Sequence, residues 1–472
     1  MPAASVVRCN RLGGIIIIVV VASAVFSSRP AAQQPGTYEA ALSRTVHDTA
    51  LANGLQVVVI ENHAVPLVTV EIAVRTGAFT QDSGDQGVPH LYEHMLFKSY
   101  GGGSDQSWGG RMGELDATYN GETGQEVVRY FVTLPSASVE GGMRALAELV
   151  RDPSFTNDNL VEERRVVDDE LARDLSDPVR LIYDQVGQRL WTTVWGRKDP
   201  GGDPKTLNAV TVKRLKTIFD RYYVPNNAML VVSGDITPGR AFKLADERFS
   251  HWPRRTDPFV GVTPLVVPPL QLPAALIMQD HVTDALVVME WQGPSTITSP
   301  EDTYAADVLS TILDASGSTF QRRLVDSGLF ASCTIGYTTR SHVGEITLTA
   351  HASVDSLPHA LVVLNAVLED LDKPVAFSDD ELADARQARR VAFARTLEYQ
   401  TSVASEVAEF WGSADLGYFR SYTDRMLAVT RSDLQRYAQR YIIAKPMALG
   451  VLVPPGTGQQ VRPVVLSFLS GQ

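Results

Sequence analysis

The chain has 472 residues, of which 44% are hydrophobic and 20% are charged. These values are ordinary for a globular protein, and they exclude both an intrinsically disordered chain and a protein with many membrane spans. The length exceeds what one hydrophobic core supports, so two or more domains are expected. The formal net charge of −12 argues against nucleic acid as the partner, although an acidic surface also serves solubility alone.

The first 35 residues are typical of a targeting segment and are not expected to belong to the fold. Arg8 and Arg11 form a basic start, residues 13–21 (GGIIIIVVV) form an apolar core, and residues 22–24 (ASA) offer a cleavage site. Because the apolar run is short for a bilayer, we expect a cleaved signal and export to the periplasm. An uncleaved membrane anchor is the alternative. Cys333 is then the remaining cysteine, so no intrachain disulfide is expected.

The first half of the chain alternates predicted strands and helices. Residues 45–60 alternate apolar and polar positions around Asn53-Gly54, a dipeptide that favours a tight hairpin turn because both residues tolerate positive φ. Further strands are predicted at 66–74, within 115–134 and at 228–234, and helices at 136–151, 156–174, 179–194 and 210–223.

A short helix over residues 87–100 carries the first chemical motif. Pro89 fits its first turn, and the three glycines at 101–103 are expected to end it. His90 and His94 lie four residues apart, so both imidazoles leave one face, with Glu93 beside them. Two imidazoles one turn apart form half of a zinc site, and an adjacent carboxylate can act as general base. The order H-x-x-E-H inverts the better known H-E-x-x-H zinc helix.

The helix at 156–174, which Thr156 or Asp158 can cap, carries carboxylates beside core positions. Four residues at spacings of four, three and four share one stripe of this helix: Glu163, Val167, Glu170 and Asp174. Carboxylates next to a core valine are uncommon unless a partner pairs with them. An exposed acidic ridge beside the neighbouring arginines is the alternative, and the spacing alone leaves both interpretations open.

The second half begins after a proline-rich stretch and repeats the first. Six prolines lie between residues 251 and 275, which predicts a linker between a domain at 36–250 and another at 276–472. In the second domain we expect strands at 276–278, 285–291 and 345–354, and helices at 301–315, 319–327, 358–371 and 379–397. Four residues recur at an offset of 219: Thr211, Leu215, Arg221 and Tyr222 match Thr430, Leu434, Arg440 and Tyr441. The predicted fold class is therefore α+β, with two homologous α/β-sandwich domains in tandem, each a mixed, largely antiparallel sheet with helices packed on it.

With both motifs in view, the sequence resembles the insulinase/pitrilysin family of inverted zinc peptidases, in particular its small bacterial and mitochondrial-processing-peptidase-like branch. The family's motif of a glycine, H-x-x-E-H and a following apolar run is matched by Gly87, His90, Glu93, His94, Met95, Phe97 and Lys98. The family's distal glutamate is matched by Glu170, 76 residues after His94. Lesser matches extend the resemblance over residues 40–455.

The resemblance implies a zinc-dependent endopeptidase that cleaves short or unfolded peptides. Zn²⁺ would be held by His90, His94 and Glu170, with a water in the fourth position. Glu93 would be the general base. Glu163 would orient a ligand histidine through its other ring nitrogen. Asn120 would lie in an edge strand that holds an extended peptide by main-chain hydrogen bonds.

One departure from the family pattern concerns the second domain. It usually contributes an arginine and a tyrosine that bind the substrate backbone, but Thr319 and Ala331 stand at those positions here. Arg322 or Tyr337 could compensate. In this family a chain of this length is half of a clamshell that encloses the peptide. We therefore expect a heterodimer in which a homologous partner supplies the arginine and tyrosine. The alternatives are a self-sufficient homodimeric peptidase and a non-catalytic assembly subunit, although this chain keeps all the zinc ligands.

Overall fold

A computed structural model describes residues 38–42, 44–100 and 107–470. The predicted signal segment, its cleavage site and the three glycines at 101–103 lie outside these residues. Within them, no helix is long and apolar enough to cross a membrane.

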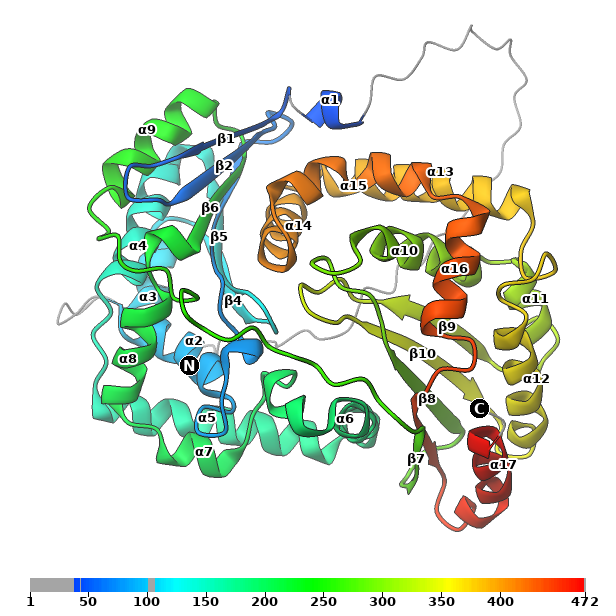
Figure 1. Cartoon of the computed structure of the whole chain (residues 1–472). Helices are drawn as coiled ribbons and strands as arrows, with labels where there is room; N and C mark the ends of the chain where they lie inside the picture. Colours follow the sequence, from blue (N-terminus) through cyan, green and yellow to red (C-terminus); the bar gives the residue numbers. More distant parts are fainter. Residues whose placement is uncertain (1–37, 43, 101–106, 471–472) are drawn as a thin grey trace, which may run out of the picture.

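Two mixed sheets form the centres of two domains (Figure 1). The first has the order β1-β2-β6-β3-β5-β4, with β1 Val46–Ala50, β2 Gln56–Glu61, β3 Leu67–Val74, β4 Thr118–Thr123, β5 Val128–Pro135 and β6 Ala228–Gly234. The second has the order β7-β11-β8-β10-β9, with β7 Ala274–Gln279, β8 Ala285–Gln292, β9 Ser332–Tyr337, β10 Glu345–Ala352 and β11 Ala448–Val453. The pairs β2/β6 and β7/β11 are parallel, and the other pairs are antiparallel. Apart from β1, the two sheets have the same topology, which confirms two homologous domains in tandem.

Helices cover both sheets. Those of the first half are α1 Tyr38–Leu42, α2 Val88–Lys98, α3 Trp108–Glu114, α4 Val139–Arg151, α5 Asn157–Ser176, α6 Pro178–Trp191, α7 Pro204–Ala209, α8 Val212–Tyr222 and α9 Pro238–Phe249. Those of the second half are α10 Pro300–Asp314, α11 Thr319–Leu324, α12 Leu357–Glu369, α13 Asp379–Thr396, α14 Gln400–Ser413, α15 Leu416–Ala428, α16 Arg431–Tyr441 and α17 Gly458–Ser470.

The repeated segment performs the same local task in both halves. Thr211 accepts a hydrogen bond from the Arg214 N–H as the N-cap of α8, and Thr430 accepts one from the Asp433 N–H as the N-cap of α16. Leu215 and Leu434, four residues after each cap, are fully buried. The repeat therefore marks where a helix begins and which face it buries.

Both faces of the first sheet are buried, so its central strands are apolar at nearly every position. In β2, Val57 and Val59 enter the core beneath α2, α4, α8 and α9. Val58 and Ile60, which point to the opposite face, enter a second core that contains Val407 of α14. A central strand buried on two sides loses the polar alternation of a half-exposed strand.

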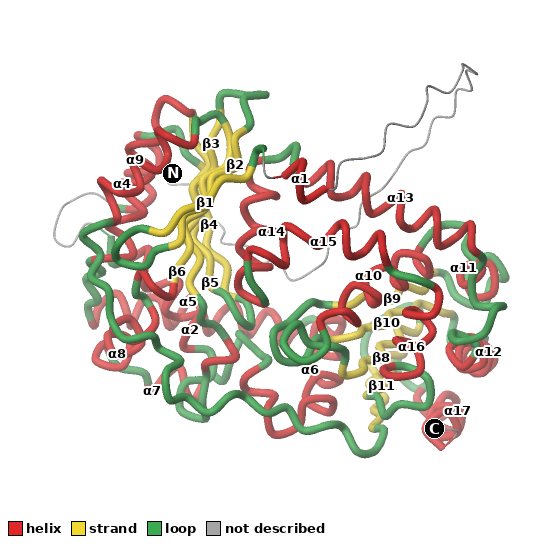
Figure 2. The backbone as a smooth tube through the Cα atoms, turned by 45° about the horizontal axis from the view of Figure 1, so that its top comes forward, coloured by secondary structure: helices red, strands yellow, loops and turns green. Residues whose placement is uncertain are grey.

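The two halves exchange helices across their interface (Figures 1 and 2). Helix α14, from the second half, packs on β3 and β6 of the first sheet. Helix α6, from the first half, packs on β8 and β11 of the second sheet. A Cβ on Gly450 of β11 would lie 2.5 Å from a methyl group of Val186 in α6, so glycine allows this close approach. Each half therefore completes the core of the other.

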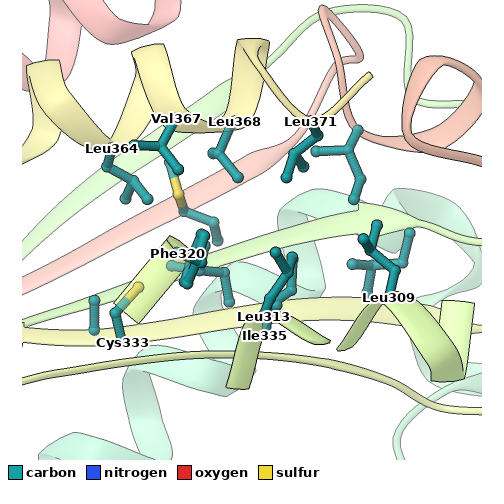
Figure 3. Packing of buried hydrophobic residues seen from close by; sticks show 14 of the residues in the cluster. Leu309, Leu313, Phe320, Cys333, Ile335, Leu364, Val367, Leu368 and Leu371 are labelled. Carbon is teal, nitrogen blue, oxygen red and sulfur yellow. The ribbon is translucent and has the colours of Figure 1, made fainter. Parts of the chain in front are cut away.

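The outer core of the second half lies between its sheet and helices α10, α11 and α12. Figure 3 shows Leu309 and Leu313 of α10, Phe320 of α11, and Leu364 and Leu368 of α12 packed against one another. Cys333, the free cysteine of the described chain, is buried in the same core.

Several local predictions were wrong or incomplete. Helix α2 ends at Lys98, before the glycines expected to stop it. In the β1–β2 turn only Gly54 has positive φ, at 95°, whereas the Asn53 amide donates to the Phe249 and Trp252 carbonyls. Strand β7 begins at Ala274, inside the predicted linker. Elements α3, α7, α9, β9, α14 and α15 were not predicted.

Candidate metal centre

Helix α2 begins at a glycine whose conformation other residues rarely adopt. Gly87 is its N-cap, with φ of 84°, and a Cβ there would lie 2.7 Å from the Gly201 carbonyl oxygen. The Gly87 N–H donates to the Gln81 side chain at 2.6 Å. This tight start fixes where the first turn of α2, and therefore His90, lies relative to the core.

Helix α5 runs beside α2 and supplies the carboxylates. Its N-cap is Thr156, whose side chain accepts a hydrogen bond from the Asn159 N–H. Leu160 and Val167 are buried on the face toward the core, and Glu163 is buried with them. The predicted stripe therefore faces α2 over Glu163 to Glu170 and is not an exposed ridge there.

The structure brings His90, His94 and Glu170 together. One ligand atom of each lies within 4.8 Å of the others. Glu170 Oε2 is 3.8 Å from His90 Nε2 and 3.6 Å from His94 Nε2. The two imidazoles are edge to face, with ring centroids 4.9 Å apart. Two imidazole nitrogens and a carboxylate oxygen that converge in this way are a donor set suited to zinc.

The other nitrogen of His94 has a carboxylate partner. His94 Nδ1 lies 3.1 Å from Glu163 Oε2, and Lys98 Nζ lies 3.2 Å from Glu163 Oε1. A carboxylate on Nδ1 favours the tautomer that carries its proton there, which leaves Nε2 as an acceptor. His94 Nε2 is buried and has no hydrogen-bond partner among the described residues. A zinc ion bound here would give His94 Nε2 the partner that it lacks. His90, His94 and Glu170 therefore fit a zinc ion.

Glu93 lies next to this group but faces the edge strand β4. The Thr123 hydroxyl donates to Glu93 Oε2 at 2.7 Å. A Cβ on Gly121 would lie 2.7 Å from Glu93 Oε1, so a glycine in β4 makes room for the carboxylate. Burial raises the pKa of Glu93 to about 7, although the charge of His94 and the Thr123 hydrogen bond act to lower it. A carboxyl group with a pKa near neutral pH suits proton transfer.

Both halves of the chain line the pocket at this site, which has a volume of about 370 Å³. The first half contributes His90, Glu93, Pro200 and residues 121–125, and the second contributes Thr338, Arg340, Glu345, Thr347 and Glu409. The second-half residues were not predicted from the sequence, because they carry no motif and come close to α2 only in the folded chain.

Other residues named from the sequence lie elsewhere. Asn120 is in the edge strand β4, opposite Phe131 of β5, but does not line the pocket. Asp174, at the end of the predicted stripe, lies 3.4 Å from Arg180 instead.

Thr319 and Ala331, which stand at the positions of the family's arginine and tyrosine, form hydrogen bonds within the second domain. Thr319 donates through its N–H and hydroxyl to Glu381, and the Ala331 N–H donates to the His351 carbonyl at 2.7 Å. The two residues that could compensate, Arg322 and Tyr337, do not line the pocket either. Arg322 donates to Thr319, and the Tyr337 hydroxyl donates to the Pro294 carbonyl at 3.1 Å.

Two family models match consecutive parts of the chain. The model for insulinase (peptidase family M16) matches residues 56–193, and the model for the M16 inactive domain matches residues 209–389. The zinc protease PqqE of Helicobacter pylori is 25% identical over 401 residues, which cover 83% of this chain and 89% of that protein. The mitochondrial-processing peptidase subunit beta of Blastocladiella emersonii is 23% identical over 428 residues, which cover 86% and 88% of the two chains.

Solved structures share the whole two-domain fold. A protease from Helicobacter pylori matches with a TM-score of 0.73 and 22% identity over 87% of this chain and 99% of that one. The periplasmic protease PqqL from Escherichia coli matches with a TM-score of 0.75 and 18% identity over 90% of this chain but 50% of that one. The chain belongs to the insulinase family of zinc metallopeptidases, peptidase family M16. In this chain the first domain carries the candidate metal-binding group, and residues 209–389 match the family's inactive domain.

Proposed function

We propose that this chain is a zinc-dependent endopeptidase that cleaves short or unfolded peptides, with Glu93 as the general base. The observation that carries the proposal is the convergence of His90, His94 and Glu170 within 4.8 Å. Glu93 lines a pocket together with His90. When bound, zinc supplies the Lewis acidity that makes water a nucleophile near neutral pH and polarises the scissile carbonyl.

The chain's own residues then have separate tasks. Glu93 takes the proton of the attacking water and passes it to the leaving amine, while Thr123 holds one oxygen of that carboxylate. Glu163 orients the His94 ring, and Lys98 in turn holds Glu163.

The edge strand β4 supports a peptide in extended form as the substrate. Hydrogen bonds within the first sheet join β4 to β5 on one side only, so the other side of β4 can pair with an added strand. Residues 121–125 of β4 and the turn after it line the pocket, and Asn120 lies next to them. A short or unfolded peptide presents an extended segment to this edge without first having to unfold.

We further propose that the active species is a heterodimer with a homologous partner that lacks zinc ligands. Thr319 and Ala331 lack the groups of the family's arginine and tyrosine, and Arg322 and Tyr337 lie outside the pocket. PqqL of Escherichia coli, of which this chain matches half, supports a chamber of two such halves. A homodimer that cleaves peptides without these groups is the alternative. The apolar segment at 13–21 supports export to the periplasm, the compartment named for PqqL.

The test of the chemistry is the substitution Glu93→Gln, which removes the base and leaves the metal-binding group intact. Zinc content should stay at the wild-type level while peptide cleavage falls by about 100-fold or more. Cleavage retained by this variant would exclude Glu93 as the base. A well-folded wild-type chain that binds no zinc would exclude the enzyme itself.

The test of the assembly is an assay of the chain alone and together with a homologous partner, where the genome encodes one nearby. The heterodimer predicts little cleavage by either chain and rapid cleavage by the mixture. Equal rates for this chain alone and for the mixture would favour the homodimer.

A further inference from the structure

The pocket contains an arginine from the second domain that the family motif does not account for. Arg340 lies in the loop between β9 and β10, and it shares the pocket with His90 and Glu93 of the first domain. Among the residues described as lining the pocket, it is the one arginine or lysine, and the others include four carboxylates: Glu93, Glu122, Glu345 and Glu409.

The loop that carries Arg340 is fixed against the first domain. The Ser341 N–H lies 2.8 Å from Glu126 Oε2, and the Ser341 hydroxyl donates to Glu126 Oε1 at 2.6 Å. The Arg340 carbonyl accepts a hydrogen bond from the Thr296 N–H at 3.0 Å. Glu126 lies just after the turn that ends β4 and is itself buried. The main chain of the loop at Arg340 is therefore held at a set position relative to the edge strand.

One donor of the Arg340 guanidinium, Nε, has no hydrogen-bond partner among the described residues. The Arg340 side chain is 18% exposed, and the nearest carboxylate oxygen, Glu345 Oε2, is 3.7 Å from Nε, beyond hydrogen-bond range. The other Glu345 oxygen is engaged by Lys198 at 3.2 Å and Gln125 at 2.7 Å. A partly exposed guanidinium that lines the pocket and keeps an unpaired donor can bind an acceptor that arrives from outside.

We infer that Arg340 binds a main-chain carbonyl of the peptide as it lies in the pocket, so the second domain of this chain supplies part of the substrate clamp. The four carboxylates of the pocket disfavour a further carboxylate from the substrate, whereas a carbonyl oxygen is a neutral acceptor that a guanidinium binds directly. This inference rests on the proposed peptidase function. It assigns to Arg340 a backbone-binding task that Thr319 and Ala331 cannot perform.

The experiment measures peptide binding without turnover. A short fluorescein-labelled peptide with uncharged side chains is titrated with the zinc-loaded full chain carrying Glu93→Gln, in the presence of the partner if cleavage requires one. Adding Arg340→Gln should weaken Kd about tenfold, which is the cost of losing one charged hydrogen bond. Adding Arg425→Gln is the matched control and should leave Kd unchanged, because Arg425 lies in α15, is 56% exposed and does not line the pocket.

Two further measurements are needed. One distinguishes a loss of peptide binding from a loss of the folded state, and the other distinguishes binding of a main-chain carbonyl from binding of the peptide's terminal carboxylate. The Arg340→Gln protein should keep the zinc content of the wild type and remain folded at the temperature of the binding assay. If that variant fails to fold, Arg340→Lys, which keeps the charge but loses the planar fork, should fold and bind more weakly. The loss should be equal for peptides with a free and an amidated carboxyl terminus.

An unchanged Kd in both Arg340 variants would overturn the inference. So would a loss confined to the free-acid peptide, or one accompanied by loss of zinc or of the folded state. These failures are distinct from failure of the proposed function. If the proposed peptidase function were wrong, the wild-type chain, with zinc and any partner, would cleave no peptide at all.

Discussion

The two halves of the chain place a pair of helices in corresponding positions but join them by different chemistry. In the first half, α2 follows β3 and packs beside α5, and the contact consists of two histidines and the carboxylates Glu163 and Glu170. In the second half, α10 follows β8 and packs beside α13, where Arg389 Nη2 lies 3.5 Å from Asp307. Tyr422 also donates to Asp307, at 2.6 Å. A candidate metal site in one half is matched by an ion pair in the other.

Two arginines that make the same contact in the two halves allow α5 and α13 to be aligned residue by residue. Arg164 of α5 donates to the Val210 carbonyl, one residue before the N-cap of α8. Arg386 of α13 donates in the same way to the Val429 carbonyl, one residue before the N-cap of α16. Counted from these arginines, Ala385 and Ala392 of α13 stand where α5 has Glu163 and Glu170. The fold therefore does not require carboxylates at these positions, and the candidate ligand Glu170 has its place in the first half alone.

The largest expected effect comes from removing a ligand in the first half. His94→Ala should lose zinc and reduce kcat/KM for peptide cleavage at least ~1,000-fold, because a catalytic metal supplies several kcal/mol of transition-state stabilisation. Metal analysis and peptide assays measure both effects. His351→Ala, an exposed histidine of β10 in the second half, is the control and should change neither. A His94→Ala protein with full zinc content would show that His94 is not a metal ligand, and the first half would then not differ from the second by a metal site.

A smaller effect is expected from the carboxylate behind the ligand. Glu163→Gln keeps the shape at His94 Nδ1 but removes the charge, so zinc affinity should fall by about 10- to 100-fold. Competition with a chelator measures this affinity. Asp174→Asn, on the same helix but paired with Arg180, should leave it unchanged. Equal affinities in both variants would show that Glu163 only fills space.

Breaking the Arg389–Asp307 ion pair of the second half should lower the free energy of unfolding and leave zinc binding unchanged. Arg389→Met leaves Asp307 in a buried site, and because the Arg389 side chain is 27% exposed the loss should be about 2 kcal/mol, below the value for a fully buried pair. Chemical unfolding measures the loss, and zinc content should not change. The double variant with Asp307→Leu should recover much of the stability. Loss of zinc from Arg389→Met would mean that the two helix pairs are coupled.

The smallest expected effect concerns the contact between the halves. Burial alone would raise the pKa of Glu126, but hydrogen bonds from His342 and Ser341 and the Arg340 charge hold it below its ordinary value of 4.5. Because the folded-state pKa is lowered, Glu126 contributes stability above about pH 4.5, and this contribution is lost as the pH falls.

The matching experiment is a series of thermal midpoints from neutral pH to below the ordinary pKa of Glu126. Glu126→Gln should lower the midpoint at neutral pH and flatten its decline in acid. Glu148→Gln, an exposed carboxylate of α4, should follow the wild-type curve. A wild-type slope in Glu126→Gln would show that this contact does not respond to pH.

Local patterns predicted the elements that carry the site. The four-residue spacing of His90 and His94 placed them on one face of a helix because a helix turn has 3.6 residues. The recurring threonines marked two helix starts because an N-cap depends on residues close in sequence. The elements that were missed have weaker local signals, such as β9, in which Cys333 and Ile335 are the buried apolar residues of a short strand.

The amino-acid sequence was enough to predict the tandem architecture, the candidate metal-binding group and the carboxylate beside it, because these depend on short-range geometry and on motif spacing. Tertiary structure alone decided that α6 and α14 cross to the opposite sheets, that Glu163 reaches His94 and that Arg340 enters the pocket. Such contacts join residues far apart in sequence. They follow from how two buried sheet faces are covered, which no local pattern encodes.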